Sequence, residues 1–217
     1  MSISKNLSNL NNSLEDSVKL VAVSKTKSNQ QIMEAYNNGQ RVFGENKVQE
    51  LSAKHEVLPK DIEWHMIGHL QRNKVKYIAG FVKLIHSVDN IKLLKEINRQ
   101  ALKYNLTINC LIQVKIASEE TKFGMSKEEV KNMLDSQVFK ELKNVSIVGL
   151  MGMASFTNNQ EILKKEFSFL NTFFKELSKS YSTMKILSMG MSDDYKLAIE
   201  NGSNMIRLGS SIFGSRN

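Results

Sequence analysis

Short apolar runs recur along the chain, and eight of them can be distinguished. They are LVAVSK (20–25), RVFGE (41–45), EWHMIG (63–68), KLIHSVD (83–89), INCLIQVKIA (108–117), VSIVGLMGMAS (145–155), KILSMGMS (185–192) and NMIRLGSS (204–211). Most of them are apolar at consecutive positions rather than at alternating positions. This pattern is typical of strands that are covered on both faces, as in parallel sheets.

Segments with helical spacing lie between these runs. Ile91, Leu94 and Ile97 share one face of such a segment, and Ser126 with Glu129 forms a capping-box pattern at the start of another. Alternating strands and helices imply a parallel sheet. Eight such units in about 200 residues predict an α/β fold, a closed (β/α)₈ TIM barrel of the small kind. An open, doubly wound sheet is the alternative that the pattern leaves open.

The composition predicts a single domain. The chain has 217 residues, of which 41% are hydrophobic and 24% are charged, as in ordinary globular proteins. Its one proline, Pro59, leaves no Pro-rich linker, and no Gly/Ser-rich stretch divides the chain. We therefore expect one domain over residues 1–217. Residues 1–15 are rich in Asn and Ser, and we expect them to form a weak helix or a frayed arm.

The charge does not predict a nucleic-acid partner. The chain carries 30 Lys and Arg against 22 Asp and Glu, a net charge of +8. The lysines are spread over nearly every predicted helix instead of forming one stripe, which favours a solvated surface over a binding patch. A modest positive excess also suits a small phosphorylated ligand.

Cysteine usage and hydropathy indicate a cytoplasmic protein. Cys110 is the only cysteine, so no internal disulfide can form, as expected in a reducing compartment. The N-terminal residues lack the apolar core of a signal peptide. No run approaches the roughly 18 apolar residues that a membrane-spanning helix needs.

The best candidate for chemistry follows the last two runs. Barrel enzymes carry their functional groups at the C-terminal ends of the strands, and they often bind phosphate after the last two. Here Ser192 follows one run, and Gly209 and Ser210 follow the next. Backbone N–H groups and hydroxyls at these positions can hold a phosphate. Ordinary turn chemistry is the alternative, because Ser and Gly are common in loops.

Lys25 and Arg207 are charged residues at the ends of apolar runs. Strand alternation places Lys25 on the face of Val21 and Val23, so its amine can point into the top of the barrel. A desolvated lysine is nucleophilic and forms Schiff bases with aldehydes. A lysine that extends into solvent is the alternative, and Lys27 is the rival amine.

Arg207 shares a face with Met205 and needs an acceptor inside the barrel. That acceptor can be a carboxylate, a phosphate or a ring nitrogen. A structural ion pair, for example with Glu45, is the alternative. We expect His65 to be a core histidine whose ring nitrogens are hydrogen-bonded. No histidine shows metal-ligand spacing, so we expect no metal.

Seven motifs in order resemble the pyridoxal phosphate homeostasis proteins. They are VAVSKTK, FGENKVQE, WHMIGHLQRNK, KFGMS, GLMGM, SMGMSDD and IRLGSSIFG, and the resemblance extends over about residues 18–214. The resemblance implies a barrel like the alanine racemase N-terminal domain, with pyridoxal 5′-phosphate (PLP) as cofactor. Two departures are Ser28, where the family commonly has proline, and Gly152 within GLMGM.

The resemblance assigns a cofactor role to six positions. Lys25 matches the lysine that holds PLP as a Schiff base, and Asn46 matches a residue beside the cofactor ring. Ser192, Gly209 and Ser210 match the phosphate ligands. Arg207 matches the arginine that faces the pyridine nitrogen. Lys122 is a candidate secondary amine.

The implied function is PLP binding in intracellular PLP homeostasis, as a carrier or buffer that influences amino-acid balance. A permanent cation at Arg207 disfavours a second positive charge on the ring nitrogen, which makes PLP a poorer electron sink. Related racemases add a tyrosine from an extra domain, for which this sequence has no counterpart. We therefore expect no catalytic residues.

Two other functions stay open, a PLP-dependent amino-acid racemase or lyase and a phosphosugar-binding barrel without cofactor. The expected partners are PLP, free amino acids and apo forms of PLP-dependent enzymes. We expect a monomer or a weak homodimer.

Overall fold

Within residues 2–117 and 123–214, which the computed structural model describes, eight parallel strands close into a barrel in chain order. The strands are β1 (Lys19–Val23), β2 (Val42–Glu45), β3 (Glu63–Met66), β4 (Leu84–Val88), β5 (Ile108–Val114), β6 (Val145–Gly152), β7 (Ile186–Ser188) and β8 (Met205–Leu208). Each predicted run overlaps one strand. Because β8 pairs with β1 from Lys19↔Met205 to Ala22↔Leu208, the barrel is confirmed and the open sheet was the wrong alternative.

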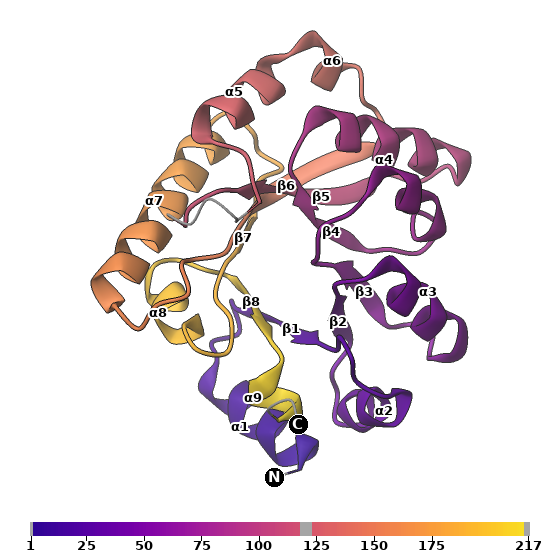
Figure 1. Cartoon of the computed structure of the whole chain (residues 1–217), viewed down its shortest axis with the longest axis vertical. Helices are drawn as coiled ribbons and strands as arrows, with labels where there is room; N and C mark the ends of the chain where they lie inside the picture. Colours follow the sequence, from indigo (N-terminus) through magenta and orange to yellow (C-terminus); the bar gives the residue numbers. More distant parts are fainter. Residues whose placement is uncertain (1, 118–122, 215–217) are drawn as a thin grey trace.

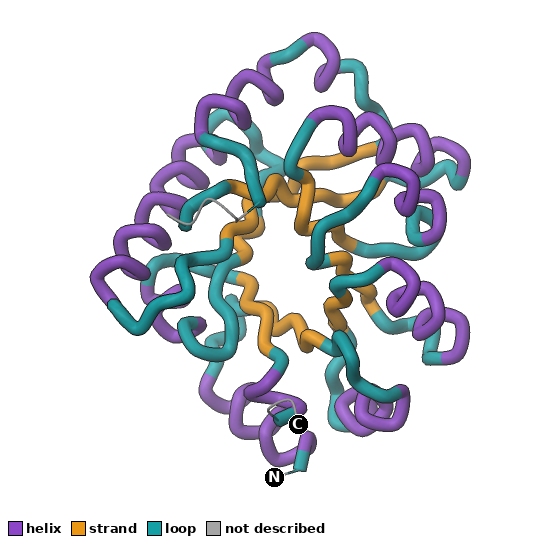
Figure 2. The backbone as a smooth tube through the Cα atoms, in the orientation of Figure 1, coloured by secondary structure: helices purple, strands orange, loops and turns teal. Residues whose placement is uncertain are grey.

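Helices surround the ring of strands, as Figure 2 shows. They are α1 (Ile3–Ser13), α2 (Asn29–Asn37), α3 (Val48–Val57), α4 (Ile91–Lys103), α5 (Lys127–Asp135), α6 (Gln137–Lys140), α7 (Gln160–Ser178), α8 (Tyr195–Glu200) and α9 (Ser210–Phe213), with the 3₁₀ helix η1 (Arg72–Tyr77). Two capping boxes begin helices. Ser126 caps α5 as predicted, and Ser28 caps α2 with Gln31.

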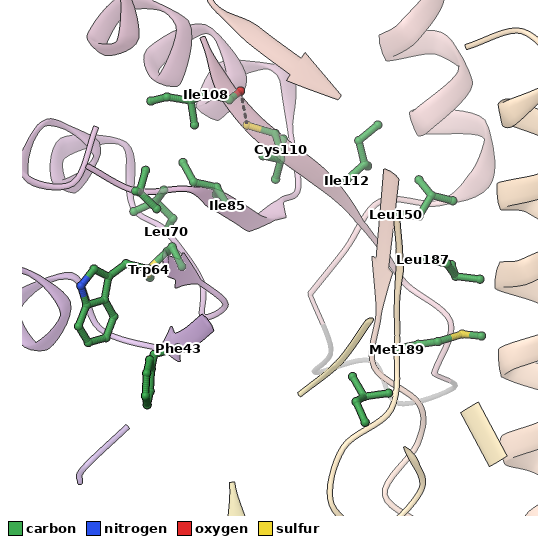
Figure 3. Close-up of a cluster of buried hydrophobic side chains, with 14 of the residues drawn as sticks. Phe43, Trp64, Leu70, Ile85, Ile108, Cys110, Ile112, Leu150, Leu187 and Met189 are labelled. Atoms are coloured by element: carbon green, nitrogen blue, oxygen red, sulfur yellow. Dashed lines mark hydrogen bonds between the residues drawn. The ribbon is translucent and has the colours of Figure 1, made fainter. Parts of the chain in front are cut away.

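Strand alternation divides the core into two layers. The outward layer lies between the strands and the helices, and Figure 3 shows part of it, including Phe43, Trp64 and Cys110. Cys110 is fully buried, and burial raises the pKa of its thiol, which leaves it unreactive. The inward layer fills the barrel with Val21, Val42, Leu84, Leu111, Met151 and Met205. The barrel interior is therefore packed rather than open.

The N-terminal segment is a packed helix. Residues 1–15 were expected to form a weak helix or a frayed arm, but α1 buries Ile3, Leu7 and Leu10. These residues recur at helical spacing, so one face of the helix is apolar. Asn6 Nδ2 also donates to the Ile212 carbonyl of α9 at 2.9 Å, and α1 lies beside α9 near both chain ends (Figure 1). None of the described helices is long and apolar enough to cross a membrane.

Candidate functional site

A cavity of about 430 Å³ opens at the C-terminal end of the strands. Its volume lies within the range of small-molecule sites. It is lined by all six residues that the sequence singled out, Lys25, Asn46, Ser192, Arg207, Gly209 and Ser210. These residues come from the loops after β1, β2 and β7 and from β8 and the turn after it. The fold thus brings together positions that span most of the chain.

Lys25 lies in the turn that follows β1. The strand ends at Val23, earlier than the predicted run, although Ser24 N still donates to the Gly44 carbonyl of β2 at 3.0 Å. The Lys25 side chain is half-buried and lines the cavity beside Val23. The predicted face is therefore right even though the lysine stands beyond the strand.

The turn is unusual because Thr26 has a φ of 65°. A β-branched residue rarely adopts this left-handed conformation, so surrounding contacts must hold it. One such contact is the Thr26 N–H, which donates to Glu50 Oε1 at 2.6 Å. The backbone after Lys25 is therefore fixed from α3.

A buried ion-pair network fixes the backbone before Lys25. Lys54 Nζ donates to the Ser24 carbonyl at 2.8 Å and to Glu45 Oε1 and Glu50 Oε1 at 2.7 Å each. Ser24 Oγ also donates to Glu45 Oε1, at 2.6 Å. Burial raises the pKa of Glu45, while the hydrogen bonds from Lys54 and Ser24 oppose that shift. The network lies between the barrel wall and α3, and the sequence pattern did not indicate it.

Arg207 is buried in the upper interior of the barrel. Its Nη1 donates to Ser188 Oγ at 2.6 Å, and its Nη2 donates to the Gly152 carbonyl at 3.0 Å. Burial lowers the pKa of Arg207 to about 10, so the side chain stays cationic at neutral pH. The alternative of an ion pair with Glu45 is wrong, because Glu45 points outward and pairs with Lys54.

A chain of polar side chains continues from Arg207 through the barrel. Ser188 Oγ lies 3.3 Å from His86 Nδ1, and His86 Nε2 lies 3.0 Å from His65 Nδ1. Burial lowers the pKa of His65 to about 3 and that of His86 well below its usual range. Both rings are therefore neutral near pH 7. His65 is the hydrogen-bonded core histidine that the sequence predicted.

Ser192 connects the two loops at which a phosphate site was predicted. Its Oγ accepts N–H groups from Gly209 at 3.3 Å and from Ser211 at 3.4 Å. The loop reaches this position through Gly190, whose φ is +95° and where a Cβ would lie 2.7 Å from that of Ala198. The hydroxyl proton of Ser192 can then be donated to an anion at the mouth.

Further residues line the cavity besides these six. Lys27, the rival amine, lines the same cavity, as do His69 and Gln113. His69 stands at the end of the third predicted run, but its spacing gave it no role, and Gln113 points inward near the end of β5, where the sequence assigned no site residue. Lys122, the candidate secondary amine, lies outside the described residues. Within the described ranges, no group of three or more His, Cys, Asp and Glu could hold a metal ion.

Sequence comparison matches the chain to a known domain. The family model described as "Alanine racemase, N-terminal domain" matches residues 1–217. A pyridoxal phosphate homeostasis protein of Aquifex aeolicus is 43% identical over 204 residues, which cover 93% of this chain and 89% of that protein. One from Schizosaccharomyces pombe is 42% identical over 202 residues, covering 92% and 84%.

Comparison with solved structures finds the same fold in related proteins. PipY of Synechococcus elongatus with PLP bound superposes with a TM-score of 0.89 at 35% identity, covering 98% of this chain and 100% of that chain. An alanine racemase of Clostridium difficile superposes with a TM-score of 0.83 at 14% identity, covering 99% of this chain and 57% of that one. At that identity, the second likeness shows a shared fold.

Proposed function

Because the chain belongs to the family of pyridoxal phosphate homeostasis proteins, on the alanine racemase N-terminal fold, we propose that it binds PLP and acts in PLP homeostasis as a carrier or buffer. The observation that carries this proposal is that Lys25, Asn46, Ser192, Arg207, Gly209 and Ser210 line one and the same cavity. The PLP-bound relative PipY supports the choice of ligand.

The donor set fits this ligand. A phosphate needs N–H and O–H donors, and the turn at Gly209–Ser210 with the Ser192 hydroxyl can supply them. Lys25, Lys27 and Arg207 make the cavity rich in positive charge, with Asp193 as an opposing carboxylate. PLP supplies an aldehyde that a primary amine captures reversibly, and Lys25 is the amine that we assign to this role.

The position of Arg207 favours storage of PLP over PLP-dependent catalysis. By the family resemblance, it would face the ring nitrogen. Ser188 and the Gly152 carbonyl hold its guanidinium in place, and a fixed cation disfavours protonation of a neighbouring nitrogen. Without that proton the ring withdraws electrons weakly. We therefore propose a non-catalytic role, with free amino acids and apo-enzymes as recipients of PLP.

The amine assignment can be tested by trapping. The protein is mixed with PLP, reduced with borohydride and digested for peptide mass spectrometry. We expect near-visible absorbance and an adduct on Lys25 that persists in Lys27→Ala and disappears in Lys25→Ala. An adduct on Lys27 or Lys122 would contradict the site. A protein that stays colourless would contradict PLP binding and favour a phosphosugar ligand.

The carrier assignment needs a separate measurement. Racemase and lyase products are assayed with the PLP-loaded protein and several amino acids. We expect no turnover above the Lys25→Ala control, together with reactivation of an apo PLP-dependent enzyme by the loaded protein. Turnover clearly above that control would show that the protein is an enzyme.

A further inference from the structure

His69 stands at the mouth of the cavity with its ring held on two sides. It follows β3, and its Nδ1 lies 3.3 Å from Asp89 Oδ2 in the loop after β4. The ring also stacks on Phe123, with centroids 4.7 Å apart and an interplanar angle of 21°. The His69 side chain is 45% exposed, so a molecule that enters from solvent can reach it.

The loops around His69 fix this arrangement. A Cβ at Gly68 would lie 2.4 Å from the Asn46 carbonyl oxygen, so the backbone before His69 abuts the loop after β2. Gln113, buried at the end of β5, donates from Nε2 to the Phe123 carbonyl at 3.1 Å. The stacking partner is therefore anchored to the barrel.

Asp89 Oδ2 lies at ion-pair distance from His69 Nδ1, 3.3 Å, and so places a negative charge beside that nitrogen. A carboxylate accepts only, so it favours the proton on Nδ1 and leaves a lone pair on Nε2. Among the described residues, no group forms a hydrogen bond to Nε2. The free nitrogen belongs to a ring that lines the same cavity as Lys25.

The charged groups around the cavity leave His69 with a distinctive role. Imidazole is the side-chain type whose ordinary pKa lies nearest neutrality, whereas carboxylates, amines and guanidinium groups titrate far from it. In the described part of the chain, the other charged residues that face the cavity or His69 are Lys25, Lys27, Arg72, Asp89, Asp193 and Arg207. None of these side-chain types normally exchanges protons near pH 7.

We propose that His69, oriented by Asp89, is the proton-transfer residue for amine exchange at Lys25. This inference rests on the proposed function. An incoming primary amine, such as that of an amino acid, arrives as an ammonium and must lose a proton before its nitrogen can attack. The carbon that PLP contributes through its aldehyde forms a C–N bond to the incoming nitrogen, and its C–N bond to Lys25 Nζ breaks.

The protons balance within the exchange. Those lost by the incoming nitrogen equal in number those taken up by the Lys25 nitrogen, and His69 Nε2 relays them without an added reactant. Asp89 stabilises the imidazolium that forms on the way. The cofactor is thereby released to an amine without any bond to carbon being made or broken in the amino acid.

The test compares exchange with loading. Wild type, His69→Gln and Asp89→Asn are loaded with PLP, and release to an excess of amino acid is followed by absorbance from pH 5 to 8. Since general acid–base catalysis contributes 10²–10⁴-fold, we expect exchange in His69→Gln at pH 7 to fall by about 100-fold, measured per molecule of protein loaded with PLP. Added imidazole should restore part of the rate.

A second readout needs no cofactor. Nitrogen chemical shifts of His69 in the unloaded protein should place the proton on Nδ1, and Asp89→Asn should move it toward Nε2.

His55→Gln is the matched control for the exchange experiment, because His55 also stacks on a phenylalanine, Phe81, but lies outside the cavity. It should exchange like wild type.

Two results would overturn the inference while leaving the proposed function intact. One is a loaded His69→Gln variant that exchanges at the wild-type rate with the wild-type pH profile. The other is a loss of PLP affinity that accounts for the whole change in rate. Wild type that fails to load PLP would instead contradict the proposed function.

Discussion

At the scale of single residues, the Ser192 hydroxyl links the two loops at which we propose a phosphate site. Its oxygen accepts two backbone N–H groups, from Gly209 and Ser211. Those N–H groups precede or begin α9, where a helix has no internal acceptors for its first donors. Ser192 therefore satisfies the turn and keeps its own proton for a ligand.

Replacing Ser192 by Ala should weaken PLP binding selectively. The change leaves two N–H groups without their acceptor and, in the proposed site, removes a donor to the phosphate. Hydrogen bonds to charged groups contribute about 1.5–3 kcal/mol, so affinity should fall about 10- to 100-fold. Pyridoxal, which lacks the phosphate, should bind wild type and variant equally in a fluorescence titration. Ser211→Ala keeps its backbone N–H and serves as control. An equal loss for both ligands would mean that the turn itself had collapsed.

At the scale of elements, α3 holds the turn that carries Lys25. Lys54 reaches from α3 to the Ser24 carbonyl, and Glu50 of the same helix accepts the Thr26 N–H. Lys54 is 6% exposed and Glu45 is fully buried. Buried charges of this kind depend on each other, because either one alone would lack compensation.

Lys54→Met should therefore destabilise the protein and disturb Lys25. Breaking a buried pair costs about 3–5 kcal/mol, which urea unfolding would measure, and capture of PLP by Lys25 should slow. Adding Glu45→Gln should recover part of the stability, because the uncompensated carboxylate is gone. Lys47→Met is the control, since Lys47 is exposed just before α3. A Lys54→Met variant as stable as this control would refute the argument.

At the scale of the whole molecule, the barrel encloses histidines that stay neutral. His65 is 2% exposed and His86 is fully buried. Burial lowers the pKa of His65 to about 3, whereas an unfolded histidine has a pKa of about 6.5. Below about pH 6.5 the unfolded chain therefore binds more protons than the folded one.

Stability should consequently fall as the pH decreases from about 6.5 toward 3. Each of the two buried histidines, His65 and His86, can add up to about 1.4 kcal/mol per pH unit to the slope of the free energy of unfolding within this window. Urea unfolding at several pH values between 5 and 7 would measure it. His86→Gln should lower the slope, even if the variant is less stable overall. A free energy of unfolding that stays constant from pH 7 to 5 would contradict the burial argument.

Much of the fold was predictable because its signals are local. Strands covered on both faces are continuous apolar runs, and the segments between them carry helical spacing, so the barrel followed from their number and order. The ends of strands were less predictable. The predicted run that contains Lys25 extends two residues beyond β1, which ends at Val23. The end of a strand depends on how far the adjacent strands continue to form backbone hydrogen bonds with it.

The sequence by itself determined the order of strands and helices and, through the family motifs, the six positions that line the cavity. Closure of the sheet into a barrel was decided by the pairing of β8 with β1. Only the tertiary structure decided what surrounds these six positions. These contacts are Lys54 with the Ser24 carbonyl, Ser188 with Arg207, and Asp89 and Phe123 with His69, and each joins separate elements. Such contacts depend on how distant parts of the chain pack together, and neither spacing nor periodicity encodes that packing.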